Sequence, residues 1–380
     1  MDLPYDSSRL DRLMDEAGAD VLLVGTRHNI RYLCGGYYYH FYARFTAVAQ
    51  AVYTPLLGIP KNQPDKAFFV GIAGEVGQIN DQDVWVPEFI SAGANVRPNP
   101  IASAQKTAEA IKARGLEKGT IATEFHFLAS TTMDCLRKEL PDATFIEVMP
   151  IMEELRAIKT PEELAIMNRI TQADSEAIQE SFRNSPQGAT TFEIASMVEQ
   201  EMTKRGLLFL WVFTCAGNTM LRSPSEKVWE MGEVLHLDAG GAYDDYLTDV
   251  CRMGVRGEPT PLADEIYKAC LSTQDKVRAA IKPGAVCGDL FEFGNKTFGE
   301  TDFGDLGYFI IHGVGLVSHE LPRFAQGVER KLEEGMVISV ETDVRHPDVG
   351  YVKIEDTVAV TADGCVGMGD LGRENWAIVD

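Results

Sequence analysis

The chain has 380 residues, enough for two domains, and 45% of them are hydrophobic, which permits well-packed cores. A net charge of −22 argues against nucleic acid or an anionic membrane as a partner, because both carry dense negative charge. The seven cysteines are scattered without CxxC spacing, which is typical of reduced thiols. The acidic N-terminus lacks the basic start of a secretory signal, and no apolar run approaches the ~20 residues of a membrane helix. We therefore expect a cytoplasmic protein.

The first part of the chain alternates helical and strand patterns. Apolar spacing predicts helices over residues 7–17 and 104–113, and short apolar runs predict strands within residues 19–25 and 66–72. Such alternation indicates a smaller α/β domain, which we place at residues 1–153.

A helix start marks the beginning of the second part. Thr160 would be the N-cap, Pro161 the first helical residue, and Glu163 the reciprocal partner of a capping box. We expect one long helix over residues 162–184 and another over residues 191–205.

The rest of the second domain, residues 154–380, shows mainly strand patterns. Apolar runs follow each other at residues 207–217, 233–241 and 244–255, and a helix is predicted over residues 262–281 before further strands. Helices packed on one face of a largely antiparallel sheet make an α+β domain.

Five potential metal ligands stand within these strand-like runs. Carboxylates in such runs are costly to bury unless they are paired or bound to a cation. Four carboxylates and one imidazole suit two divalent metal ions that share bridging carboxylates and activate a water molecule for hydrolysis. The five residues are Asp238, Asp249, His312, Glu341 and Glu355.

These residues belong to a series of motifs. DAG and TD contain the first two, HGVGLVSHELP begins at His312, VISVE ends at Glu341, and YVKIEDT contains Glu355. With LRAIKTPEEL at the entry to the second domain, the series resembles the M24 metallopeptidases, the pita-bread family of methionine aminopeptidase, Xaa-Pro aminopeptidase, prolidase and creatinase. The resemblance covers essentially the whole chain. It implies a pita-bread C-terminal domain preceded by a smaller, creatinase-type α/β domain.

The resemblance also implies a dinuclear metal centre. Asp249 and Glu355 would bridge two divalent ions, with Asp238 completing one site and His312 and Glu341 the other. Hard oxygen ligands with one histidine accept Mn, Fe, Co or Zn, so the metal itself stays open.

Two residues receive catalytic roles from the same resemblance. Glu341 would take a proton from the attacking water. His319, seven residues after His312, matches the family's second histidine, which contacts the substrate and stabilises the developing oxyanion.

Two arginines match positions that hold a substrate carboxylate in creatinase. Arg323 lies eleven residues after His312, and Arg44 ends a segment that resembles the one entering the neighbouring subunit's site. A guanidinium suits bidentate recognition of a carboxylate. The resemblance therefore implies a homodimer in which Arg44 completes the partner's site.

Two positions depart from the peptidase pattern. Leu221, followed by Arg222, stands where these peptidases carry a histidine seventeen residues before the first metal ligand, and Tyr308 replaces a histidine typical of the Xaa-Pro enzymes. His236 shares a strand face with Asp238 and is expected to be a core histidine or one placed just behind the ligands.

Three functions follow from these observations. The leading one is a dinuclear hydrolase of an amide or peptide bond in a small carboxylate-bearing substrate, similar to Xaa-Pro dipeptidase or aminopeptidase. The second is a non-peptidase member acting on a small metabolite as an amidohydrolase, a creatinase-like hydrolase or a metal-dependent lyase. The third is a catalytically silent binding module.

Overall fold

The computed structural model describes residues 3–42, 52–93 and 98–380. The chain forms two compact units, Met1–Leu155 and Arg156–Asp380. Each has its own hydrophobic core. Within the described parts of the chain, no helix is both long enough and apolar enough to cross a membrane.

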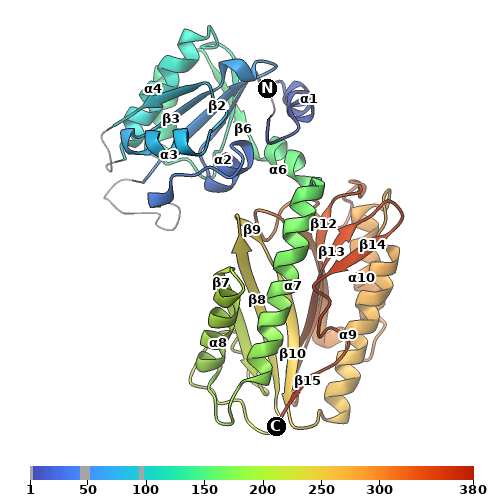
Figure 1. Ribbon diagram of the computed structural model, residues 1–380. Coiled ribbons are helices and arrows are strands. Elements are labelled where there is room, and N and C mark those ends of the chain that lie inside the picture. The colour runs from blue at the N-terminus through green and yellow to red at the C-terminus, as the bar shows by residue number, and fades with distance from the viewer. Residues whose placement is uncertain (1–2, 43–51, 94–97) are drawn as a thin grey trace. The chain divides into compact units, whose positions relative to one another are not determined.

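The first unit is built on a six-stranded mixed sheet in the order β4-β3-β2-β1-β5-β6. β1 pairs antiparallel with β2 and parallel with β5, which is the mixed pairing of an α/β unit (Figure 1). The strands are β1 Val21–Val24, β2 Leu56–Pro60, β3 Phe68–Gly71, β4 Glu88–Ser91, β5 Thr120–Thr123 and β6 Thr144–Glu147.

The helices of this unit are α1 Ser7–Ala17, α2 Arg27–Leu33, α3 Val76–Asp81, α4 Pro100–Ala113, α5 Ser130–Glu139 and α6 Met149–Ala157, with one-turn 3₁₀ helices at His40–Tyr42, Pro64–Lys66 and Ala73–Glu75. The expected elements over residues 7–17, 19–25, 66–72 and 104–113 are confirmed as α1, β1, β3 and α4. α1 begins where Asp6 accepts a hydrogen bond from the backbone of Arg9.

The second unit contains a nine-stranded sheet with the main order β11-β12-β13-β10-β8-β7. All of its neighbouring pairs are antiparallel except β10 with β15. The strands are β7 Leu208–Ala216, β8 Val234–Tyr243, β9 Tyr246–Leu247, β10 Val250–Arg256, β11 Gly307–Gly313, β12 Val337–His346, β13 Gly350–Val360, β14 Cys365–Met368 and β15 Ala377–Val379.

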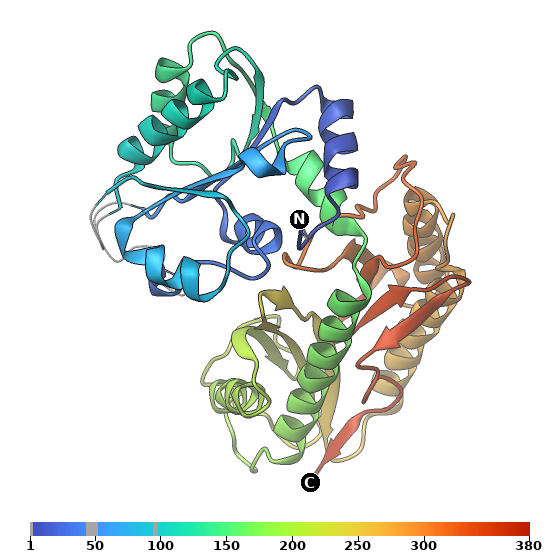
Figure 2. The ribbon, with the colours of Figure 1, turned by 45° about the horizontal axis from the view of Figure 1, so that its top comes forward.

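Four long helices cover this sheet. α7 packs on β8 and β10, α8 on β7, α9 on β12 and β13, and α10 on β11. In both views α7 and α8 lie side by side (Figures 1 and 2). The helices are α7 Pro161–Arg183, α8 Thr191–Lys204, α9 Pro261–Ala280 and α10 Cys287–Gly299, and a 3₁₀ turn spans Gly304–Leu306.

Local sequence explains where these helices begin. The Thr160 hydroxyl accepts from the backbone of Glu163, whose carboxylate accepts from the backbone of Thr160 at 2.7 Å, so the expected capping box is confirmed. Thr190 and Glu193 repeat the arrangement at α8.

The helix α10 was not predicted, because only strands were expected after residue 281. Its glycines disfavour a helix in isolation. At Gly294, however, a Cβ atom would lie 2.2 Å from the ring of Phe309 on β11. Packing of the helix against the sheet therefore overrides its weak propensity.

The two faces of the sheet have different neighbours. Leu235, Leu237 and Ala239 of β8 pack with Ile170 and Ile178 of α7 in one core cluster. Because side chains alternate along a strand, residues 236 and 238 face away from the helices. We call the face that points away from the helices the open face, and a site can form on it.

Candidate metal centre

Strand register alone places three of the predicted ligands in one row. Cys251 of β10 lies opposite Asp238 of β8 on one side and Glu355 of β13 on the other. Glu355 in turn lies opposite Glu341 of β12. Side chains that are directly opposite lie about 5 Å apart on the same face. Three acidic side chains from three strands are thereby brought together on the open face.

The other two predicted ligands flank this row. Asp249 is two residues before Cys251 and so shares its face. His312 of β11 lies opposite Ser339, which is two residues before Glu341. The imidazole reaches the carboxylates directly, with Nε2 at 3.1 Å from Glu341 Oε1.

All five predicted ligands meet at one place, and all are buried. Their ligand atoms form two overlapping groups, each within 4.8 Å: Asp238, Asp249 and Glu355 in one, and His312, Glu341 and Glu355 in the other. His312 Nε2 lies 3.7 Å from Glu355 and 4.0 Å from Asp249.

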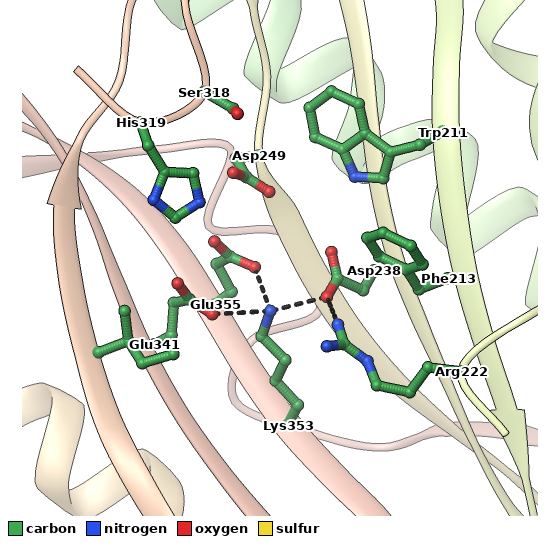
Figure 3. Close-up of a pocket in the computed structure, with 11 residues that line it drawn as sticks. Trp211, Phe213, Arg222, Asp238, Asp249, Ser318, His319, Glu341, Lys353 and Glu355 are labelled. Atoms are coloured by element: carbon green, nitrogen blue, oxygen red, sulfur yellow. Dashed lines mark hydrogen bonds and ion pairs between the residues drawn. The ribbon is translucent and has the colours of Figure 1, made fainter. Parts of the chain in front are cut away.

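Four of the five predicted ligands line a pocket of about 370 Å³, and His312 lies behind them. Figure 3 shows His319 on the same side as Glu341 and the aromatic rings of Trp211 and Phe213 across from them. The ring of His319 stacks on His312 with centroids 3.8 Å apart. The pocket is lined by Trp211, Phe213, Arg222, Asp238, Asp249, Ile310, Ser318, His319, Glu341, Lys353 and Glu355.

Lys353, which was not predicted as a site residue, lies in the middle of this cluster. Its ammonium is 2.7 Å from Asp238, 2.8 Å from Glu341 and 2.7 Å from Glu355 (Figure 3). The signal was available, because Lys353 is two residues before Glu355 on one strand and must share its face. A lysine within the YVKIEDT motif is therefore a member of the site.

Arg222 is a second cation at the site and was noted only as the neighbour of Leu221. Its Nη2 donates to Asp238 Oδ2, the same oxygen that Lys353 contacts. Its guanidinium carbon lies 4.9 Å from the ring centre of Phe213 and 5.0 Å from that of Tyr351.

The carboxylates repel one another in the absence of a sufficient counter-charge. Burial, together with the charges of Glu355 and Asp238, raises the pKa of Asp249 well above its ordinary value. Burial acts in the same direction on Glu355, but Lys353 and His312 outweigh it and lower the pKa of that carboxyl. For His312, burial lowers the pKa, whereas contacts with Glu341 and Glu355 raise it to about 10.

The donor set fits divalent cations. Four buried carboxylates share two fixed positive charges, Lys353 and Arg222, so the cluster keeps an excess of negative charge. Among the described residues, the one ion pair of Asp249 is its 4.0 Å contact with His312. Oxygen and imidazole donors in two groups that share Glu355 are those expected for two adjacent hard or borderline metal ions.

A separate buried ion-pair cluster holds the loop that carries His319. The next residue, Glu320, contacts Lys159 at 2.9 Å and Arg156 at 3.3 Å, and all three side chains are at most 2% exposed. Arg156 and Lys159 belong to the LRAIKTPEEL motif, so two motifs that are far apart in sequence meet here. The pairing fixes the backbone next to the pocket histidine.

The remaining predicted residues lie elsewhere. Arg323 is exposed and is not one of the pocket-lining residues, and Arg44 falls outside the described residues. Tyr308 accepts a hydrogen bond from Arg345 at 2.6 Å, and the side chain of Leu221 is exposed. His236 is fully buried against the ring of Tyr351, as expected for a core histidine.

Comparisons with known proteins agree with this geometry. Residues 165–362 match the model of metallopeptidase family M24, and residues 7–158 match that of the creatinase/prolidase N-terminal domain. The Xaa-Pro dipeptidase of Pyrococcus furiosus is 33% identical over 238 residues, which are 60% of this chain and 68% of that protein. The Xaa-Pro dipeptidase of Pyrococcus horikoshii is 26% identical over 379 residues, or 96% and 97% of the two chains.

A solved structure carries the same fold. The Xaa-Pro dipeptidase from Bacillus anthracis matches with a TM-score of 0.81 at 26% identity and covers 98% of each chain. The expected fold, a pita-bread domain preceded by a creatinase-type domain, is confirmed. Since the first family model alone spans more than half of the sequence, the chain belongs to metallopeptidase family M24.

Proposed function

We propose that this enzyme is a metal-dependent dipeptidase of the Xaa-Pro type, which hydrolyses the peptide bond of a small carboxylate-bearing substrate. The observation that carries the proposal is the cluster of four buried carboxylates and the His312 imidazole, in which all four carboxylates line a pocket. A volume of about 370 Å³ lies in the range of small-molecule sites and suits a dipeptide. The full-length relatives that bear the name Xaa-Pro dipeptidase support the same reaction.

Two divalent ions would be held by the five ligands. Asp238, Asp249 and Glu355 would hold one, and His312, Glu341 and Glu355 the other. When bound, the ions supply a polarised substrate carbonyl and a water of lowered pKa.

The side chains around the ligands supply the rest of the chemistry. A carboxylate oxygen of Glu341 faces the pocket and accepts the proton of the attacking water. His319 lines the pocket and donates a hydrogen bond to the carbonyl oxygen as negative charge develops there. The rings of Trp211 and Phe213 form the apolar side of the pocket and exclude water from the substrate.

One observation favours a second candidate, hydrolysis or lysis of a small non-peptide metabolite. His319 is the one imidazole among the residues that line the pocket, because Leu221 and Tyr308 occupy the positions of two family histidines. This pocket has one imidazole in its lining and two further cations, Lys353 and Arg222. Its proton donors therefore differ from those of a typical Xaa-Pro enzyme. The catalytically silent alternative has no such support, since all five ligands are present.

Metal analysis followed by a substrate screen tests the function. Purified protein should hold close to two divalent ions per chain and cleave Ala-Pro or Gly-Pro, and Asp249→Ala should lose both properties. Bound metal without turnover of any dipeptide would transfer the proposal to the metabolite reaction. Absence of stoichiometric metal, with activity unchanged in Asp249→Ala, would contradict both enzyme functions.

Assembly and compartment are further parts of the proposal. We expect a homodimer in which Arg44 enters the partner's site, and light scattering that finds a fully active monomer would contradict it. None of the seven cysteines, all of which lie in the described residues, forms a disulfide, which supports a reducing compartment such as the cytoplasm.

A further inference from the structure

We propose that Arg222 binds the substrate's carboxylate, so that the enzyme selects small peptides whose free carboxylate lies next to the cleaved bond. The inference rests on the proposed function and deepens it, because it names the residue and the anionic group that set the substrate class. Arg222 lies on the segment between β7 and β8 and lines the same pocket as Asp238, Asp249, Glu341 and Glu355 (Figure 3).

The two cations in the pocket, Lys353 and Arg222, differ in how many hydrogen-bond donors remain available to bind a substrate. Lys353 has three N–H groups, and its three carboxylate contacts use all of them. Arg222 has five N–H groups, and the one acceptor that the described residues give it is Asp238. Its Nε is buried and without a hydrogen-bond partner. Among the lining residues, Arg222 is therefore the cation that can still bind an anion.

The local charge favours an anion over an ammonium group. Asp238 Oδ2 is shared by Arg222 and Lys353, so one carboxylate faces two positive charges. The α-ammonium of a dipeptide would meet repulsion at this end of the pocket, whereas a carboxylate would be attracted. The partial burial of Arg222, whose side chain is 31% exposed, strengthens both effects.

The guanidinium is also held in place before any substrate arrives. It lies against the rings of Phe213 and Tyr351, and its bond to Asp238 fixes one edge. Such a group loses little freedom when it binds a planar carboxylate through two hydrogen bonds. Phe213 lies directly opposite Asp238 across β7 and β8, so strand register sets this arrangement.

The test compares each peptide with its C-terminal amide, for example Ala-Pro with Ala-Pro-amide, on the metal-loaded enzyme. The wild type should prefer the free carboxylate by about tenfold to a hundredfold in kcat/KM, the effect of one charged hydrogen-bonded pair. Arg222→Met should lose most of this preference, mainly through KM. Arg222→Lys, which keeps the charge but not the planar fork, should retain part of it.

Binding measurements separate substrate recognition from damage to the metal site, because Arg222 also touches Asp238. Calorimetry of the metal-loaded protein should show that proline binds more tightly than prolinamide, and that Arg222→Met removes this difference while metal stoichiometry stays at the wild-type value. Arg169→Met is the matched control, since Arg169 stacks on Tyr243 outside the pocket lining. It should leave every value unchanged.

The outcomes distinguish the inference from the proposed function. If the wild type cleaves dipeptides but Arg222→Met keeps the full carboxylate preference, the inference is wrong and the function stands. The inference also fails if the preference disappears in Arg323→Met instead, which would return the role to the residue that the family resemblance assigned. No turnover or binding of any dipeptide by the wild type would contradict the proposed function itself.

Discussion

Glu355 and Asp356 are neighbours on β13, yet their side chains lie in opposite kinds of environment. Glu355 faces the pocket, where four carboxylates share one lysine and one arginine. Asp356 faces the other side and forms ion pairs with Arg252, Arg278 and Arg373 at 2.8–3.1 Å. Both carboxylates are buried. On one side of the strand the carboxylates outnumber the lysine and the arginine beside them, whereas on the other side three arginines share one carboxylate.

The comparison separates a functional cluster from a structural one. Burial raises the pKa of Asp356, but the three arginines outweigh it and hold the pKa below its ordinary value, so this carboxylate needs no further partner. Asp249 on the pocket side has a pKa raised well above its ordinary value by burial and by its acidic neighbours. Buried carboxylates without a matching counter-charge are the arrangement expected of a cation-binding site.

The largest expected effect comes from Asp249→Asn. Loss of one ligand should lower kcat/KM by about a thousandfold, because metal ions supply several kcal/mol of transition-state stabilisation. In metal-free protein the same change should raise the melting temperature, since it removes a buried charge repelled by its neighbours. Steady-state kinetics and differential scanning calorimetry check the two parts. Asp363→Asn, at an exposed position, should change neither quantity.

The corresponding substitution on the other side of β13, Asp356→Asn, should lower stability and leave metal binding unchanged. Asp356→Asn removes the carboxylate shared by two buried arginines, Arg252 and Arg373, and the half-buried Arg278, and should lower the free energy of unfolding by about 3–5 kcal/mol. Metal stoichiometry should stay at the wild-type value, because Asp356 does not face the pocket. Denaturant unfolding and metal analysis measure these quantities. A variant of normal stability that binds less metal would reverse the roles that we assign to the two sides.

Removing the metals should destabilise the wild type by a smaller amount. A ligand present at a hundred times its dissociation constant stabilises a fold by about 2.7 kcal/mol, so chelation should lower the melting temperature by a few degrees. Asp249→Asn should show little response to chelator. A wild-type protein whose melting temperature ignores both chelator and added metal would show that the pocket does not bind cations.

The free energy of unfolding of the metal-free protein should depend on pH through two clusters, the pocket carboxylates and the ion pairs of Glu320. Asp249 has a raised pKa in the folded state, so its ionisation destabilises the fold, and stability should increase as the pH falls through that pKa toward the ordinary value of 3.8. For Glu320, burial raises the pKa, but Lys159 and Arg156 outweigh it and hold the pKa below its ordinary value of 4.5. Its stabilising contribution is present above about pH 4.5 and disappears as the pH falls further.

Measurements of the free energy of unfolding between pH 8 and pH 3 test whether stability first increases and then decreases as the pH falls. Asp249→Asn should lose the initial gain, and Glu320→Gln should be destabilised at neutral pH and lose less stability on acidification. A metal-free wild type that loses stability continuously from pH 8 downward would contradict the repulsion between pocket carboxylates.

That the five predicted ligands meet could be foreseen from the sequence, because each stands in or directly beside a short strand with a recognisable neighbourhood. Capping signals also located α7 and α8, since Thr160 and Thr190 act within one helical turn. The spacing of two residues places Lys353 on the same face as Glu355, but which carboxylates its ammonium contacts depends on the register with neighbouring strands, which the sequence does not show. The helix α10 was missed for a related reason, because Gly294 is required by Phe309 of another element. Contacts between distant segments were the part that the sequence could not supply.

The smallest expected effect concerns the start of α7, which leads from Lys159 into the helical cover of the sheet. Thr160→Ala removes one reciprocal capping bond and should cost about 1 kcal/mol of unfolding free energy, and Thr160→Ser should restore it. Thr190→Ala at α8 has the same geometry and is the control, so chemical denaturation should give similar losses for both. The ion pairs of Glu320 do not depend on the Thr160 hydroxyl. Turnover per folded molecule should therefore be unchanged, whereas a selective loss in Thr160→Ala would show that the helix start helps to position His319.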